Sequence, residues 1–205
     1  TYLRRELEQR YAFNNIIGRS PRMQAIFGLI ERVARTASTV LIHGEISSRV
    51  AQAVTAQLLA LAADSDEPIT MFLHSEGGHV EAGDSIHDMV RFIKPRVRIV
   101  GTGWVASAGV HIYLSVPRED RLALPNTRFM IHQPMGGAHG RASDIHIEAE
   151  ELLRARARLN QCIADATGQS LEKVAEDTDR NFWMSPEEAQ EYGIVGKIIR
   201  SASEL

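Results

Sequence analysis

Short apolar runs alternate with longer amphipathic segments along most of the chain. Branched apolar residues dominate four runs, at residues 39–45, 68–75, 96–107 and 127–134. Between the first two, residues 47–62 carry apolar side chains every three or four positions, the spacing of one helix face. This alternation predicts parallel strands joined by crossover helices, and therefore an α/β fold.

A second pattern begins where residues 135–144 become rich in glycine, which predicts a segment that leaves the compact body. A long amphipathic helix is predicted directly after it, over residues 144–166. Its apolar stripe consists of Ile145, Ala149, Leu152, Leu159 and Ile163. Ser170 is a good N-cap for a further helix, and Ser185 followed by proline predicts the start of another, after which the chain ends in a strand.

Composition and charge narrow the function classes. Hydrophobic residues make up 44% of the 205 residues, and the net charge is −3 with a pI near 6.2, so nucleic acid is not an expected partner. Apolar runs stay below the roughly 18 residues of a membrane span, and no signal peptide is visible. Cys162 is the only cysteine, so no internal disulfide forms, and the chain is expected in the cytoplasm.

The eight histidines are scattered singly, without a helical spacing to cysteine or acidic ligands. No metal site and no cofactor are therefore expected. Cys162 itself lies in a charged helical stretch and is interpreted as a packing residue.

Three turns carry candidate chemistry. Gly77–Gly78 joins a strand to a helix, Ser107 stands among small apolar residues in "GWVASAG", and His132 ends an apolar strand in "MIHQP". Each has an ordinary structural interpretation: a tight turn, a small packed serine and a structural histidine. The small neighbours of Ser107 would also allow a sharp turn that exposes its hydroxyl, as in a nucleophile elbow, although the glycine spacing of that motif is not met.

Together the three turns predict more than each does alone. Parallel strands end at a common edge of a sheet, where α/β proteins bind ligands. A serine hydroxyl needs a neighbouring base to become nucleophilic, and a tetrahedral intermediate needs two N–H donors. The sequence supplies these groups, but spacing alone leaves open whether they meet.

Residues 39–205 resemble a known family. The motifs "GWVASAG", "ALPNTRFMIHQPMGG" and "TGQSLEKVAEDTDRNFWMSPEEAQEYGIV" are similar to those of the proteolytic subunit of the ATP-dependent Clp protease. The resemblance implies a serine endopeptidase with the crotonase-like α/β fold, a spiral head of repeated β-β-α and βαβ units from which a helix-strand handle protrudes. It also implies two stacked seven-membered rings that enclose a chamber, fed with unfolded protein by a partner ATPase ring.

The resemblance also assigns roles to single residues. It makes Ser107 the nucleophile and His132 the general base, and Gly78 and Ala108 the oxyanion-hole N–H donors. The residues that match the substrate-backbone strands are His79, Val80, Pro134, Met135 and Gly136.

Asn181 is the main departure from the family pattern, because it stands where the third triad member is an aspartate. An amide oxygen can hold the His132 ring but offers no negative charge to an imidazolium. We therefore expect a weakened peptidase, with turnover lower by roughly 10–10⁴-fold. Asp179 could replace it after a backbone shift, but a loop or interface salt bridge is the favoured role.

Two further departures lie near the glycine turn and the serine. Glu76 replaces a proline before the two glycines, where its charge either alters the pocket or faces solvent. Trp104 stands where a small polar residue is usual, and either narrows the pocket or packs in the core.

Residues 1–38 form a separate N-terminal helical segment in this interpretation, with an amphipathic helix starting at Ser20. Residues 1–44 resemble the start of the ATPase domain of bacterial enhancer-binding transcription activators. The phosphate loop that follows in those proteins is missing, so nucleotide cannot be held in that way. The segment is therefore not expected to be an ATPase. One interpretation is a fused or engineered piece that caps the pore or serves for docking, but for the helix from Ser20 simple burial in the core or an interface is favoured.

Two alternatives remain beside an active peptidase. One is an attenuated or inactive ring subunit that completes or regulates a mixed-ring complex, which Asn181 favours and the Ser107–His132 pair opposes. The other is an acyl-CoA enzyme of the crotonase type, which would not need Ser107.

Overall fold

The computed structural model describes residues 38–205. The predicted N-terminal segment, including the helix from Ser20, falls almost wholly outside these residues. Within the described part of the chain, no helix is both long enough and apolar enough to cross a lipid bilayer.

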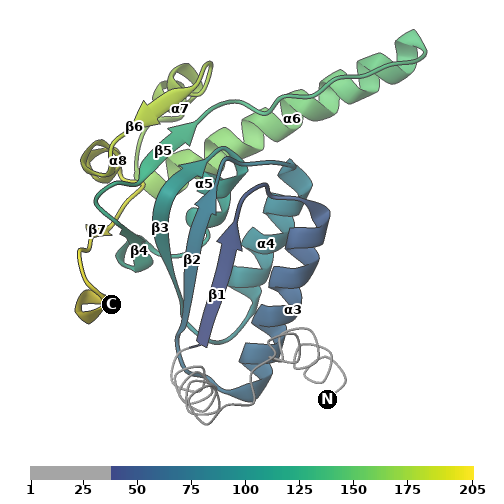
Figure 1. The fold of residues 1–205 in the computed structure, drawn as a ribbon. Helices are drawn as coiled ribbons and strands as arrows, with labels where there is room; N and C mark the ends of the chain where they lie inside the picture. The colour runs from purple at the N-terminus through teal and green to yellow at the C-terminus, as the bar shows by residue number, and fades with distance from the viewer. Residues whose placement is uncertain (1–37) are drawn as a thin grey trace, which may run out of the picture.

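A parallel sheet forms the body of the molecule (Figure 1). Its strands lie in the order β1-β2-β3-β4-β7, and each neighbouring pair is parallel. The strands are β1 (Ser38–His43), β2 (Ile69–Ser75), β3 (Val97–Ala106), β4 (Arg121–Ala123) and β7 (Lys197–Ile198). The parallel α/β prediction is confirmed for these strands.

The long strand β3 has two successive partners on one side. Its first half pairs with β4, and from Trp104 onward it pairs with β5 (Arg128–Ile131). β5 in turn pairs with β6 (Phe182–Met184), and this pair is antiparallel. The pattern of alternating strands and helices had indicated parallel strands only, so β6 is an exception to it.

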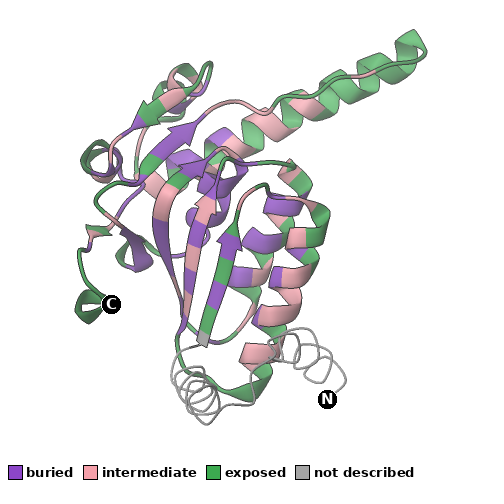
Figure 2. Ribbon diagram, in the orientation of Figure 1, coloured by how far each residue is buried: buried purple, intermediate pink, exposed green. Residues whose placement is uncertain are grey.

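Two helices cover one face of the sheet. α3 (Ser48–Asp64) and α4 (Val80–Phe92) lie side by side there, and Ser47 caps α3 through the N–H of Val50. Apolar side chains of these helices and of β1–β3 fill the space between the layers. Figure 2 colours the buried residues of this region purple along the ribbon. The largest fully buried side chains in this layer include Ile42, Leu58, Ile69, Met71, Leu73 and Ile86.

The remaining short elements follow the sheet in the chain. α5 (Ala108–Tyr113) begins directly after β3, and the 3₁₀ turns η2 (Arg118–Asp120) and η3 (Ala202–Glu204) are peripheral. α7 (Leu171–Asp177) is capped by Ser170, and α8 (Pro186–Tyr192) by Ser185. Both caps confirm the expected helix starts.

The longest helix, α6 (Ala142–Thr167), projects away from the body as a handle (Figure 1). At about 1.5 Å per residue, its 26 residues extend about 39 Å. The predicted helix over 144–166 is confirmed. The glycine-rich segment runs back along α6, with Gly136 against Leu152, but within the described chain it is extended and has no strand partner.

Candidate active site

Ser107 lies at the sharp turn between β3 and α5. Its backbone has φ 55° and ψ −121°, and among residues 38–205 it is the one non-glycine residue with positive φ. Such a conformation costs about 1–3 kcal/mol and persists only where the surroundings hold it. Here the N–H of Ser107 donates to the carbonyl of Met130 at 2.8 Å, which joins the turn to β5.

The glycine turn packs directly against this serine. Gly77 has φ +105°, and a Cβ atom at this position would lie 2.6 Å from the Cβ of Ser107. The Oγ of Ser75 accepts the N–H of Gly77 at 3.0 Å and fixes the turn. Only glycine therefore satisfies both the backbone conformation and the space at this position.

Ser107, His132 and Asn181 form one chain of hydrogen bonds. His132 Nε2 lies 2.7 Å from Ser107 Oγ, and His132 Nδ1 lies 3.0 Å from Asn181 Oδ1. Because an amide oxygen only accepts, Nδ1 carries the proton and Nε2 is left to accept from the serine hydroxyl. These residues are the nucleophile, base and third member that the sequence predicted as candidates.

The antiparallel β5–β6 pair explains why His132 and Asn181 meet. Ile131 lies opposite Phe182 in this pair, and His132 and Asn181 are the next residues outward on the two strands. A three-residue strand thus sets the position of the third member.

Two backbone N–H groups lie beside Ser107. Ile46 bonds to the carbonyl of Gly77 and to the N–H of His79, so the N–H of Gly78 between them points away from this bridge. The N–H of Ala108 is the first of α5 and has no partner within the helix. Gly78 lines the same cleft as Ser107, and Ala108 follows Ser107 directly, so their role as donors stays a prediction that this placement allows.

A cleft of about 820 Å³ opens over these groups. His79 and Val80 at the start of α4 lie along it, and the segment Pro134–Gly136 lines it as well. Ser107 and His132 also line the cleft. All five residues predicted to contact a substrate backbone thus share one cleft with the serine and the histidine.

A small apolar pocket of about 40 Å³ adjoins Ser107. Leu159 and Ile163 of α6 line it together with Ile131 and Val110. The sequence analysis assigned these two α6 residues only to the apolar stripe of the helix. Their place beside Ser107 depends on how α6 packs on the body, which helical spacing does not specify.

A network of hydrogen bonds and one ion pair joins α5 to its neighbouring helices. His111 Nε2 donates to Asp84 Oδ1 at 2.9 Å, and both terminal nitrogens of Arg158 bind the same carboxylate at 2.8 and 2.7 Å. Burial, followed by the nearby His87, lowers the pKa of His111 to about 4, so its ring is neutral. Burial raises the pKa of Asp84, but the hydrogen bond and charge of Arg158, together with the hydrogen bond from His111, outweigh it, so the pKa lies below its ordinary value. The network ties α4, α5 and α6 together.

Asp179 has the salt-bridge role favoured from the sequence. Its carboxylate pairs with Arg156 and Arg180, each at 3.5 Å, and accepts from Gln133 at 3.2 Å. His132 is held by Asn181 and not by this aspartate.

Trp104 and Glu76, the other two departures from the family pattern, lie away from Ser107, His132 and Asn181. Trp104 is 48% exposed and meets Trp183 edge-on, with ring centroids 5.3 Å apart. It therefore neither packs in the core nor lines the cleft over Ser107. Glu76 is exposed, which agrees with the solvent-facing interpretation.

Comparison with known proteins identifies the family. The family model described as Clp protease matches residues 22–202. The chain belongs to the Clp protease family. Among curated relatives, ATP-dependent Clp protease proteolytic subunit 3 of Rhizobium etli is 58% identical over 167 residues, which are 82% of this chain and 86% of the relative. Proteolytic subunit 2 of Gluconobacter oxydans is 56% identical over 168 residues, 81% of this chain and 75% of the relative.

Solved structures agree in fold. ClpP1 from Listeria monocytogenes superimposes with a TM-score of 0.77 at 55% identity, over 86% of this chain and 99% of the other. An asparagine-to-aspartate variant of the same protein gives a TM-score of 0.79, also at 55% identity, over 85% and 98% of the two chains. The predicted Clp-type fold is confirmed, and the chain is a serine-type peptidase subunit.

Proposed function

We propose that this Clp protease subunit cleaves peptide bonds with Ser107 as nucleophile, His132 as general base and Asn181 as the group that orients the histidine. The observation that carries the proposal is the continuous hydrogen-bond chain from Ser107 Oγ through the imidazole to the Asn181 amide oxygen. A serine hydroxyl is a weak nucleophile unless a base within hydrogen-bond reach takes its proton.

The steps follow from these contacts. His132 Nε2 accepts the Ser107 proton while Oγ attacks the peptide carbonyl, and the carbonyl oxygen becomes negative. The N–H groups of Gly78 and Ala108 then donate to this oxyanion. The imidazolium gives its proton to the leaving amine, and water activated by the same histidine releases the acyl group from Ser107.

The cleft accounts for the class of substrate. An extended peptide lies between His79–Val80 on one side and Pro134–Gly136 on the other. The segment Pro134–Gly136 has no strand partner in the described chain, so it can pair with the main chain of the peptide as an added strand does. The small apolar pocket beside Ser107 takes an apolar side chain next to the cut bond. Short peptides and unfolded protein segments fit this cleft, because a folded protein does not offer an extended strand of this length.

Asn181 limits the rate in this mechanism. Its amide oxygen holds the ring in the required tautomer, but it carries no charge to stabilise the imidazolium that forms when Ser107 loses its proton. This difference is the reason to expect turnover lower by roughly 10–10⁴-fold than with an aspartate. The same residue favours the second candidate function, an attenuated or inactive subunit of a mixed ring.

Two stacked heptameric rings, fed by an ATPase ring, are the assembly we propose. The outer half of α6 supports it, because Ile145, Ile147 and Leu153 are 42%, 57% and 63% exposed on a helix that has little of the body to pack against. The cytoplasm is the proposed compartment, which suits a chain whose single cysteine has no disulfide partner.

The proposal is tested by hydrolysis of a short fluorogenic peptide with an apolar residue before the cut bond. We expect measurable turnover for the natural chain and a loss of at least 100-fold for His132→Ala, because the base is removed. Equal rates for the two proteins would reject His132 as the base.

A further inference from the structure

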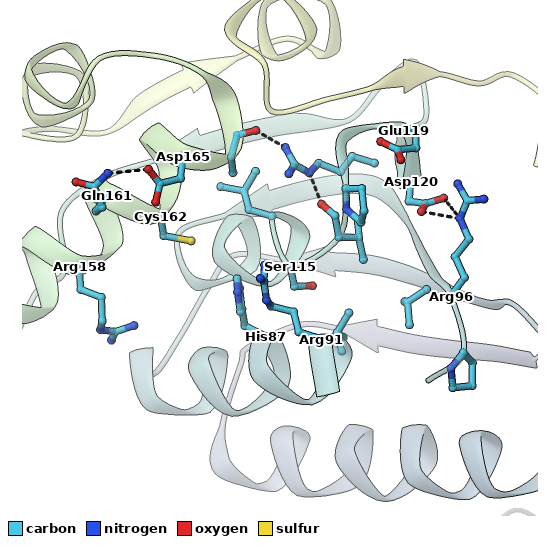
Figure 3. A pocket seen from close by; sticks show the side chains of 18 residues that line it. His87, Arg91, Arg96, Ser115, Glu119, Asp120, Arg158, Gln161, Cys162 and Asp165 are labelled. Carbon is cyan, nitrogen blue, oxygen red and sulfur yellow. Dashed lines mark hydrogen bonds and ion pairs between the residues drawn. The ribbon is translucent and has the colours of Figure 1, made fainter. Parts of the chain in front are cut away.

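Three soft ligand side chains meet where α4, α5 and α6 pack together, outside the cleft described above. His87 of α4, His111 of α5 and Cys162 of α6 each bring one ligand atom to a cluster in which these atoms lie within 4.8 Å of one another. Both histidines are buried and the cysteine is half-buried. Figure 3 shows the side chains of His87 and Cys162 reaching from different helices into one pocket.

The hydrogen bonds of the two histidines leave one unprotonated nitrogen on each ring, and that of His111 accepts from the Cys162 thiol, whose proton a metal ion would replace. His87 Nδ1 lies 2.9 Å from the carbonyl oxygen of His111, so it must carry the proton and Nε2 is unprotonated. His111 Nε2 donates to Asp84, which leaves its Nδ1 unprotonated. Histidines that bind metals commonly hold their other nitrogen in this way, on a carbonyl or a carboxylate.

The distance between the sulfur and the nearer histidine suits a tetrahedral ion. Bonds of about 2.3 Å to sulfur and 2.0–2.1 Å to nitrogen, at a tetrahedral angle, place the two ligand atoms about 3.6 Å apart. Cys162 Sγ and His111 Nδ1 are 3.7 Å apart. The two imidazole rings are stacked at 4.3 Å with 11° between their planes, so their lone pairs do not yet point at one centre. Binding one ion requires the His87 ring to turn, which lengthens its present Nδ1 bond to the carbonyl of His111.

The pocket offers a route to the cluster and room for a fourth ligand. It has a volume of about 1030 Å³ and is lined by His87, Cys162 and Asp165, the last one helical turn beyond the cysteine. Arg91 and Arg158 line it as well. Burial raises the pKa of the Cys162 thiol, although the charges of these two arginines act in the opposite direction, so a bound ion has to displace the thiol proton.

We propose that His87, His111 and Cys162 form a binding site for a soft divalent metal ion of the Zn²⁺ class, with the fourth position open to the pocket. Imidazole and thiolate ligands select such ions over Mg²⁺ or Ca²⁺. Binding forms one metal–sulfur bond and releases the thiol proton to solvent, with no change in oxidation state. The ion would clamp the three helices at the root of the handle.

Cobalt absorption tests this directly on the full chain. After treatment with a chelator, we titrate the protein with Co²⁺, whose thiolate complexes absorb in the near ultraviolet and whose tetrahedral complexes absorb strongly in the visible. We expect one ion per chain with both absorptions, displaced by Zn²⁺. Cys162→Ser should abolish the thiolate band, and His87→Gln should weaken binding at least tenfold.

His146→Gln is the matched control, because this exposed histidine on α6 contacts only Glu150 in the described chain and should leave the titration unchanged. Circular dichroism shows whether each variant is folded, and a rise in Tm with Zn²⁺ for the natural chain but not for Cys162→Ser gives a second measure. The proposal is overturned if the natural chain shows no thiolate band in the micromolar range of cobalt, or if Cys162→Ser keeps that band.

Discussion

At the scale of single residues, we propose that Asn181 sets how strongly His132 can act as a base. Its amide oxygen fixes the ring but gives no charge to the imidazolium. We expect Asn181→Asp to raise kcat on a short fluorogenic peptide by roughly 10–10⁴-fold, with a smaller change in KM, because the added charge acts after the substrate is bound.

Asn126→Asp is the control for this substitution, since Asn126 is exposed in the turn between β4 and β5 and should leave kcat unchanged. An unchanged kcat for Asn181→Asp as well would contradict the role we assign to Asn181.

Gly77 gives the second prediction at this scale. A methyl group there would lie 2.6 Å from the Ser107 Cβ, on a backbone with φ +105°. We expect Gly77→Ala to lower kcat/KM at least tenfold and the free energy of unfolding by more than about 1 kcal/mol, because the serine turn must shift. Gly168→Ala is the matched control for activity, since Gly168 also has a positive φ, +79°, but a Cβ there meets no atom within 4 Å, so kcat/KM should be unchanged. If the Gly77→Ala protein is as active and as stable as the natural chain, the turn at Ser107 does not require glycine at position 77.

At the scale of elements, the helix caps carry stability that can be measured separately from activity. Ser185 starts α8 with a reciprocal pair of hydrogen bonds, in which its Oγ accepts the N–H of Glu188 and its own N–H donates to the Glu188 carboxylate. We expect Ser185→Ala to lower the free energy of unfolding by about 1 kcal/mol in urea denaturation. Ser48→Ala, at an exposed position in the first turn of α3, should change it by less than about 0.5 kcal/mol. Equal effects of the two substitutions would show that the cap adds nothing.

The elements also show what the sequence could predict. Helical spacing predicted α3 and α6 close to their observed bounds, and the serine caps predicted where α7 and α8 begin. β6 could not be predicted as an antiparallel partner of β5, because a strand of three residues has no clear alternation. The His132–Asn181 contact depends on that pairing, so the resemblance of the motif, and not periodicity, predicted it.

Clusters formed by side chains from different elements were harder still to predict from the sequence. His87, His111 and Cys162 come from three helices, so no spacing along the chain indicated that they meet. For the same reason Leu159 and Ile163 were predicted as an apolar stripe without their place in the pocket beside Ser107.

At the scale of the whole molecule, the handle determines the expected assembly. Ile147 lies 57% exposed on the outer part of α6, where the neighbouring ring of the proposed assembly would cover it. We expect native mass spectrometry of the natural chain to show fourteen copies of the 22.8 kDa subunit, and Ile147→Asp to shift the population toward seven. Glu148 is an exposed acidic neighbour of Ile147, and Glu148→Asp should leave the number of subunits in the particle unchanged. A natural chain that is monomeric at working concentration would contradict the ring assembly.

The central claim is that the Ser107 hydroxyl attacks the substrate, and a serine-directed fluorophosphonate tests it most directly. We expect mass analysis of the digested protein to find the label on Ser107, with Ser107→Ala unlabelled and His132→Ala labelled at least 100-fold more slowly. Label that persists in Ser107→Ala at the natural rate would contradict the account.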